Sequence, residues 1–202
     1  MINRAFKQIE FIKEIDKMKN ILRMTLVGDG SRRENDAEHS WHLAIMAMLL
    51  EEYSLEPVDI SRVMKMALVH DLVEIYAGDT FAYDVEGNKN KEERENAAAA
   101  KLFSQLPKDQ ENMVLDLWHE FDAMKTKESK YANAMDRLQP FLSNCMTDGH
   151  TWKQGNIDRD HILKRMDPIR TATPELWLFI LETVDEMENN GSIPKKASTL
   201  SQ

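Results

Sequence analysis

Apolar residues recur in this chain at intervals of three and four positions, and they almost never alternate strictly with polar ones. Intervals of three and four mark one face of an α-helix, whereas strict alternation is typical of a half-buried strand. The pattern therefore predicts an all-α protein. At 202 residues the chain is long enough for one domain with a sizeable core. It contains no internal repeat, linker or low-complexity run, so we expect a single helical bundle.

Residues that break or cap helices divide this pattern into segments. A first helix is expected over residues 3–24, with Ile9, Ile12, Ile15, Ile21 and Leu22 towards the core. A second helix is expected to begin at the capping-box pattern of Asn35 and Glu38. A third helix is expected from Asp59 to about Ala77. Further helices are predicted at about 91–105, 108–125, 128–147, 158–170 and 174–189, with breaks at Pro107, Gly149, Gly155 and Pro174.

The remaining segments set the expected organisation of the chain. Residues 79–90 form the one long irregular connection. We expect the domain to span residues 1–190, with a core over about 8–145 and the C-terminal helices over 158–189. From Gly191 onward the residues are mainly Ser, Thr, Lys and Pro, which predicts a loose tail over 191–202.

The charge and cysteine content limit the partners and the compartment. The formal net charge is −9, with both signs interspersed, which disfavours broad binding to nucleic acid or an anionic membrane. A small anionic substrate remains possible, because a local cluster of arginines can override the net charge. The single cysteine, Cys145, suits a reducing cytosol. Because no secretory segment or run of about 20 apolar residues is present, we expect a soluble cytoplasmic protein.

Polar residues on two of the predicted buried faces are the first indication of chemistry. At about 100° per residue, Asp71 lies about 20° from Ile60 around the third helix, inside its apolar stripe. A lone carboxylate would be strongly disfavoured there, so it needs a cation, a metal or a proton. His39 lies on the same face of the second helix as Leu43 and Met46. Two core helices thus each bring residues of the metal-binding type to their buried faces.

The order of these residues resembles a known family. His39, the pair His70-Asp71 and Asp136 are similar to the H…HD…D signature of HD-domain metal-dependent phosphohydrolases. The short sequence motifs around these residues are similar to those of the 5′-deoxynucleotidase subgroup, which hydrolyses nucleoside monophosphates, and the resemblance covers roughly residues 8–145. The motifs are Glu38-His39-Ser40, His70-Asp71-Leu72-Val73-Glu74 and Gly78-Asp79.

The resemblance implies a function for each of these residues. One divalent cation (Mn²⁺, Co²⁺, Fe²⁺ or Mg²⁺) would be held by His39, His70, Asp71 and Asp136, a ligand set that suits such ions. Glu74 and Asp79 would be the acid/base and water-orienting carboxylates. The candidates for contacting the substrate phosphate are Arg23, Arg32 and Arg33, because a guanidinium matches phosphate oxygens. A homodimer is also implied.

Each residue also has a simpler interpretation. His39 can be a hydrogen-bonded core histidine, and Glu74 an ordinary salt-bridge partner. Asp79 can cap a turn, and Arg32 and Arg33 can be a solvated pair. Helical periodicity does not place Asp136 on the main apolar face of its helix, so its assignment depends on the resemblance.

Three functions are consistent with the sequence. The first is hydrolysis of a (deoxy)nucleoside 5′-monophosphate to nucleoside and phosphate. The second is a phosphodiesterase or triphosphohydrolase acting on a nucleotide. The third is a metal-bound module that senses or scaffolds without turnover. The presence of Glu74 and Asp79 beside the ligand set favours an enzyme.

Overall fold

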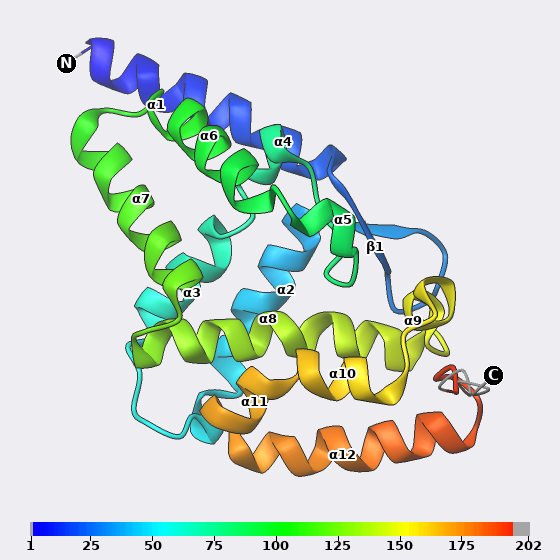
Figure 1. The fold of residues 1–202 in the computed structure, drawn as a ribbon. Coiled ribbons are helices and arrows are strands. Elements are labelled where there is room, and N and C mark those ends of the chain that lie inside the picture. The colour runs from blue at the N-terminus through cyan, green and yellow to red at the C-terminus, as the bar shows by residue number, and fades with distance from the viewer. Residues whose placement is uncertain (1, 196–202) are drawn as a thin grey trace.

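The computed structural model describes residues 2–195, which form a helical bundle with one short hairpin at its side (Figure 1). The predicted all-α fold class is confirmed. The elements are α1 (Ile2–Ile15), the 3-10 turn η1 (Asp16–Asn20), β1 (Leu22–Leu26), β2 (Arg33–Asn35), α2 (Asp36–Leu49), the 3-10 turn η2 (Glu51–Tyr53), α3 (Ile60–Val69), α4 (Glu74–Ala77), α5 (Val85–Asn88), α6 (Lys91–Phe103), α7 (Lys108–Ala123), α8 (Lys127–Met146), α9 (His150–Gly155), α10 (Arg159–Arg165), α11 (Asp167–Ala172) and α12 (Pro174–Asn189).

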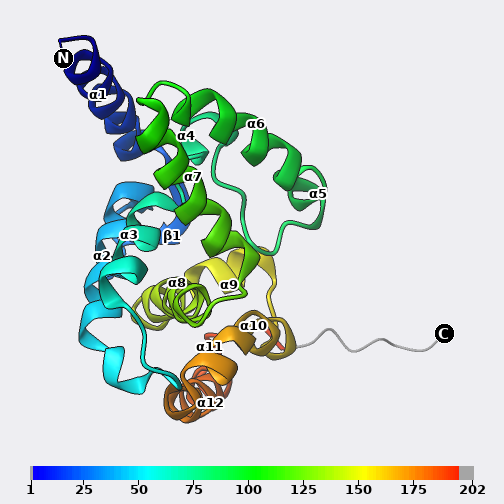
Figure 2. The same ribbon diagram turned by 90° about the vertical axis from the view of Figure 1, so that its left-hand side faces the viewer.

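Helix α8 is the centre of the bundle. It crosses the middle of the molecule in Figure 1, and Figure 2 looks nearly along it. Helices α2, α3, α7 and α11 all pack against it. Every residue from Tyr131 to Asp136 is buried, which is more than one face of a helix can bury. Polar side chains on α8 are therefore held inside the protein, and Asn133, Asp136 and Gln139 are among them.

Two clusters of buried apolar side chains meet at the end of α3. The larger cluster joins α2, α3 and α8 to the C-terminal helices, and it includes Leu43, Met66, Phe141, Ile169 and Ile180. The smaller cluster lies beneath α1, α6 and α7 and includes Phe11, Leu102, Phe103 and Trp118. Val69, the last residue of α3, packs against both. The turn that follows Val69 therefore starts at the boundary between the two clusters.

The predicted first helix is correct only in its first part. Helix α1 ends at Ile15, and residues 22–26 form strand β1 instead of continuing the helix to residue 24. β1 pairs antiparallel with β2, and Gly30 at φ 72° allows the tight turn between them. Pairing with β2 overrides the modest helical propensity of five residues.

The predicted buried face of this segment is only partly correct, because Ile15 packs partly buried against the smaller cluster but three of the other residues do not. Ile9, Ile12 and Leu22 are exposed, whereas Phe11 and Met18 are buried. Phe11 and Met18 pack into the smaller cluster. Because α1 lies at the edge of the bundle and buries only a narrow stripe, apolar residues on its other faces remain in contact with solvent.

The third predicted helix is divided into two. Helix α3 ends at Val69, and α4 begins only at Glu74. Between them the backbone makes tight i→i+3 hydrogen bonds, from Leu72 N to Val69 O (3.1 Å) and from Glu74 N to Asp71 O (2.9 Å). The position of Asp71 therefore cannot be calculated from 100° per residue, because the helix is not continuous from Ile60 to this residue. This residue nevertheless reaches the interior, because the turn itself lies there.

The later helices follow the prediction closely. Helices α6, α7, α8 and α12 end within two residues of the expected bounds, whereas the helix expected at 158–170 is split at Met166 into α10 and α11. Helix α9 was not expected, and α5 lies inside the connection 79–90. Within residues 2–195, no helix combines the length and apolar content needed to cross a bilayer.

The predicted tail lies largely outside the described residues. Residues 196–202 are not among them. At the start of the tail, Ser192 and Ile193 are buried, and their backbone N–H groups donate to Met187 O at 2.8 and 3.1 Å. The chain thus stays packed past Gly191. The division into a domain over 1–190 and a tail stays a prediction.

Candidate metal centre

Three elements bring the predicted ligand residues together. His39 lies in the first turns of α2, His70 and Asp71 lie in the turn after α3, and Asp136 lies on α8. The start of α2 is fixed by the predicted capping box, which is confirmed. Asn35 Oδ1 accepts from Glu38 N at 3.0 Å, and the Glu38 carboxylate accepts from Asn35 N at 3.2 Å. The cap holds the turn that carries His39 into the core.

The four side chains converge on one point. His39 Nε2 lies 3.0 Å from Asp136 Oδ1 and 3.7 Å from Asp71 Oδ2. His70 Nε2 lies 3.1 Å from Asp71 Oδ2 and 3.5 Å from Asp136 Oδ1. Metal–ligand bonds of about 2.1 Å place neighbouring ligand atoms roughly 3 to 3.5 Å apart. Ligand atoms of His39, His70 and Asp136 all lie within 4.8 Å of one another, as expected around a single cation, and Asp71 Oδ2 lies at the edge of this group, close to both histidines.

Hydrogen bonds from behind fix which nitrogen of each histidine faces this point. His70 Nδ1 lies 2.9 Å from Ala67 O, a carbonyl that can only accept. His39 Nδ1 lies 2.9 Å from Gln139 Oε1, and Gln139 Nε2 donates to Glu34 Oε1 at 2.7 Å. Both Nδ1 atoms are thus donors, and both Nε2 atoms can offer a lone pair. Such partners orient metal-binding histidines in proteins.

The electrostatics favour a positive charge at the same point. Burial lowers the pKa of His70, but the Asp71 and Asp136 carboxylates outweigh this and raise it to about 10. Burial also opposes ionisation of Asp136, yet Arg137, His39 and His70 hold its pKa well below the usual range. His70 Nε2 is buried without a hydrogen-bond partner. A buried nitrogen that lies close to two ionised carboxylates without a well-formed hydrogen bond to either is suited to ligating a cation.

A second acidic group lies beside the first. Asp36, Asp71 and Glu74 have carboxylate oxygens within 4.8 Å of one another. Arg23 from β1 is their counter-ion: its Nη1 lies 2.9 Å from Asp71 Oδ2 and 3.5 Å from Asp36 Oδ1. Burial and the Asp71 charge raise the pKa of Asp36 to about 7. Sequence reasoning missed Asp36, which lies in the first turn of α2 and looks like an ordinary helix-start carboxylate.

Glu74 and Asp79 also have unusual environments. Burial, and then the charges of Asp71 and Asp36, raise the pKa of Glu74 well above its ordinary value. Burial raises the pKa of Asp79 too, although Arg23 opposes the shift. Gly78, at φ 76°, ends α4 and turns the chain so that Asp79 lines the same cavity. The structure therefore places two carboxyl groups with raised pKa values beside the candidate metal centre.

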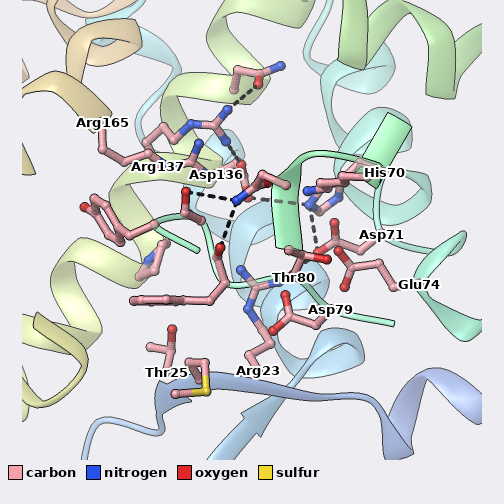
Figure 3. A pocket seen from close by; sticks show the side chains of 18 of the residues that line it. Arg23, Thr25, His70, Asp71, Glu74, Asp79, Thr80, Asp136, Arg137 and Arg165 are labelled. Atoms are coloured by element: carbon pink, nitrogen blue, oxygen red, sulfur yellow. Dashed lines mark hydrogen bonds and ion pairs between the residues drawn. The ribbon is translucent and has the colours of Figure 1, made fainter. Parts of the chain in front are cut away.

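The cavity beside the centre has a volume of about 280 Å³. Figure 3 shows its labelled side chains, with Arg23 and Asp79 on one side and Arg137 and Arg165 on another. His39 lies behind the cavity and is wholly buried. The predicted site residues that line the cavity are Arg23, His70, Asp71, Glu74, Asp79 and Asp136.

Two of the three arginines predicted to contact phosphate lie elsewhere. Arg32 pairs with Glu38, with Nη2 2.7 Å from Oε1. Arg33 donates to Arg23 O and to Leu22 O across the hairpin. Both are exposed and neither lines the cavity. These contacts of Arg32 and Arg33 thus keep both side chains out of the cavity lining, so the geometry does not support them as phosphate contacts.

Sequence reasoning missed three further residues of the site. Gln139 orients His39, Arg137 pairs with Asp136, and Arg165 lines the cavity from α10. Arg137 and Gln139 follow Asp136 within one helical turn, which is a signal that could have been used. Nothing in the sequence around Arg165 distinguishes it from a surface arginine.

The chain is similar to several known proteins. The profile of the HD domain family matches residues 15–177. The chain is 30% identical over 135 residues to the 5′-deoxynucleotidase HDDC2 of Xenopus laevis, covering 66% of each protein. It is 26% identical over 191 residues to 5′-deoxynucleotidase HDDC2 of Bos taurus, covering 94% of this chain and 89% of that one.

A solved structure is similar over nearly the whole chain. It is that of a predicted metal-dependent phosphohydrolase from Magnetospirillum magnetotacticum MS-1, with a TM-score of 0.91 and 48% identity over 96% of this chain and 97% of that one. An HD-domain phosphohydrolase from Listeria innocua shares the fold, with a TM-score of 0.61 at 17% identity over 91% and 90% of the two chains.

Proposed function

Because this chain belongs to the HD domain family, we propose that it is a metal-dependent phosphohydrolase that converts (deoxy)nucleoside 5′-monophosphates into nucleoside and phosphate. The observation that carries this proposal is the convergence of two imidazole nitrogens and two carboxylate oxygens beside a cavity lined by acids and arginines. The names of the 5′-deoxynucleotidase relatives support the substrate class.

The proposed metal ligands are His39, His70, Asp71 and Asp136. Nitrogen and carboxylate oxygen donors without a thiolate suit Mn²⁺, Co²⁺, Fe²⁺ or Mg²⁺. Such a cation, when bound, lowers the pKa of a water and polarises a phosphoryl oxygen. The protein supplies the ligand orientation, through Gln139 behind His39.

Two carboxyl groups are proposed to handle protons. Glu74, whose raised pKa favours the protonated form, donates a proton to the oxygen that leaves with the nucleoside. Asp79, which lines the same cavity, accepts a hydrogen bond from the attacking water and orients it. Burial, and then the negative charges of Asp71 and Asp36, raise the pKa of Glu74 and so keep its proton in place.

Arg23 is proposed to position these carboxylates. Its Nη1 is already engaged by Asp71 and Asp36, and Glu34 Oε2 lies 3.8 Å from its Nε. A phosphate bound at Arg23 would have to compete with these carboxylates. Arg23 thus neutralises the acidic floor of the cavity first, and it contacts the substrate only with its remaining N–H groups.

A phosphate-release screen tests the proposed activity. Nucleoside 5′-mono-, di- and triphosphates and a phosphodiester are incubated with Mn²⁺-loaded protein. We expect release from the 5′-monophosphates at least tenfold faster than from the other substrates. Faster hydrolysis of the triphosphate or the diester would move the assignment to a triphosphohydrolase or a phosphodiesterase. No release from any of them would favour a binding or scaffold role.

We further propose a cytoplasmic homodimer. Met48 and Leu49 follow Trp41 by two helical turns on one side of α2. The three side chains (Trp41, Met48 and Leu49) are 62%, 46% and 66% exposed. An exposed apolar stripe of this kind supports an interface between copies of the chain. The free Cys145 thiol is partly buried against the larger cluster, and this burial raises its pKa to about 12. A thiol of this kind is unreactive, which supports the proposed cytoplasmic location.

Replacement of Trp41 tests the dimer. Trp41→Lys is expected to convert a dimer into a monomer, as measured by light scattering on a sizing column, because it places a charge in the apolar stripe. Leu178→Lys is the matched control, since Leu178 is a 63% exposed apolar residue on α12. A monomeric wild-type protein, or a dimer that survives Trp41→Lys but not Leu178→Lys, would contradict this interface.

A further inference from the structure

Arg165 is a cation without a partner. It lines the cavity from the end of α10 and is only half-buried, yet it makes no hydrogen bond or ion pair with any of residues 2–195. Burial, and then the nearby charge of Arg137, lower its pKa to about 10. The guanidinium remains charged at neutral pH. An unpaired, partly desolvated charge is costly, so its presence in a cavity calls for a ligand.

Arg137 holds a second positive charge beside the metal ligands. Asp136 uses its two oxygens in two directions: Oδ1 lies 3.0 Å from His39 Nε2, and Oδ2 accepts from Arg137 Nη1. Arg137 Nη2 also donates to Asn133 Oδ1 at 3.3 Å. The guanidinium is therefore fixed next to the position of the cation, on the side of the cavity where Figure 3 shows Arg165.

We propose that Arg137 and Arg165 form an anion clamp that holds the phosphate of the substrate against the cation bound by Asp136. The proposal rests on the proposed phosphohydrolase function and names the residues that give it affinity for phosphate. It also assigns a role to the C-terminal helices, from which Arg165 comes.

The distribution of charge around the cavity supports this choice of ligand. Arg23 faces three carboxylates, from Glu34, Asp36 and Asp71. Lys91 also lines the cavity, but its charge is paired, because its Nζ lies 3.4 Å from Glu95 Oε1. At the Arg137–Arg165 side, the one paired carboxylate is Asp136, and the proposed metal shares its charge. This is the side with surplus positive charge, and a phosphate dianion is the ligand that two guanidinium groups and a cation bind together.

Binding of inorganic phosphate tests the clamp without requiring turnover. Phosphate is titrated calorimetrically into Mn²⁺-loaded wild-type protein, Arg165→Gln and Lys164→Gln. We expect Arg165→Gln to weaken phosphate binding about 10- to 100-fold, the loss of a charge-assisted hydrogen bond. Lys164→Gln removes the same charge from the neighbouring exposed position on α10, and it should bind phosphate like the wild type.

Thermal stability separates a ligand-binding role from a structural one. Because Arg165 makes no ion pair within residues 2–195, Arg165→Gln should leave the Tm unchanged or raise it while phosphate binding falls. A structural arginine would instead lower the Tm on replacement. Arg165→Lys keeps the charge but not the planar fork, so it should recover part of the affinity. Arg137→Gln should weaken phosphate binding to a similar extent, with the bound Mn²⁺ measured in the same sample.

The outcomes distinguish this proposal from the proposed function. Wild-type phosphate affinity in Arg165→Gln, or phosphate binding that falls equally in Lys164→Gln, overturns the clamp even if the wild-type enzyme hydrolyses 5′-monophosphates. Arginine-dependent phosphate binding in a protein that hydrolyses none of the screened nucleotides supports the clamp and removes the nucleotidase assignment. In an active enzyme, Arg165→Gln should raise the KM for the monophosphate more than it lowers kcat.

Discussion

Phosphate release is expected to stop when the bound cation is removed. In the centre, the Nε2 atom of each histidine lies 3.0–3.7 Å from a carboxylate oxygen of Asp71 and of Asp136, and within residues 2–195 no other group of potential ligands includes a histidine. Without a cation, the carboxylates hold a proton on His70, whose pKa is about 10. Water and phosphate would then face an imidazolium that neither activates water nor polarises a phosphoryl oxygen. EDTA should therefore reduce turnover to background.

Restoring the cation should restore the activity. Mn²⁺ or Co²⁺, added back after EDTA and dialysis, should return turnover in proportion to the metal bound, measured by elemental analysis. Far-ultraviolet circular dichroism before and after EDTA serves as the control for folding. Full turnover in protein shown to be metal-free would eliminate the proposed chemistry. Restoration by Zn²⁺ alone would change the assigned cation while leaving the ligand set in place.

Replacing Glu74 by Gln should lower kcat by about 10²- to 10⁴-fold, the usual range for a general acid–base group. Glu74 is buried at the edge of the ligand set and has an unpaired Oε2, and burial with its acidic neighbours favours its protonated form. Glutamine keeps the size and the hydrogen bonding but cannot give up a proton. The bound metal and the affinity for inorganic phosphate should stay close to those of the wild type.

The variant Asp71→Asn is compared with Glu74→Gln to distinguish a residue that binds the metal from one that transfers a proton. Asp71 Oδ2 lies near both histidine nitrogens, so its neutralisation should remove the tightly bound metal together with the activity. Near-normal kcat in Glu74→Gln would make Glu74 structural and Asp79 the leading acid/base candidate. If Asp71→Asn still binds one metal ion tightly per protein molecule, Asp71 is not an essential ligand and the proposed ligand set is wrong.

The helices could be predicted from the sequence because they are long and regular in pattern. Helix α12 matches its predicted bounds, and the cap of α2 was readable from Asn35 and Glu38. The hairpin could not be read, because β1 is short and its pairing with β2 is a tertiary contact. The turn at His70–Val73 was hidden for a related reason. In this turn, i→i+3 hydrogen bonds of the 3-10 type replace the i→i+4 bonds of an α-helix, and the pattern of apolar residues stays the same.

The site was only partly predictable for reasons of burial. Asp136 did not fit an apolar face because α8 is buried all round, and a helix of this kind has no single face to fit. Arg165 was missed because an arginine in a charged helix looks solvated until the packing of α10 aims it into the cavity. The arginines chosen from the sequence were near His39 in the chain, but the hairpin directs Arg32 and Arg33 outward.

The position of α8 in the chain also determines when the centre can exist during synthesis. His39 and Asp136 are 97 positions apart, and the Gln139–Glu34 hydrogen bond spans 105. A nascent chain that ends before α8 carries His39, His70 and Asp71, but it lacks both Asp136, the fourth proposed ligand, and the Gln139 amide behind His39. If these four residues are the ligands, the complete site forms only after α8 has left the ribosome and docked. Once bound, the cation ties early and late parts of the chain together as a reversible cross-link and stabilises the completed domain.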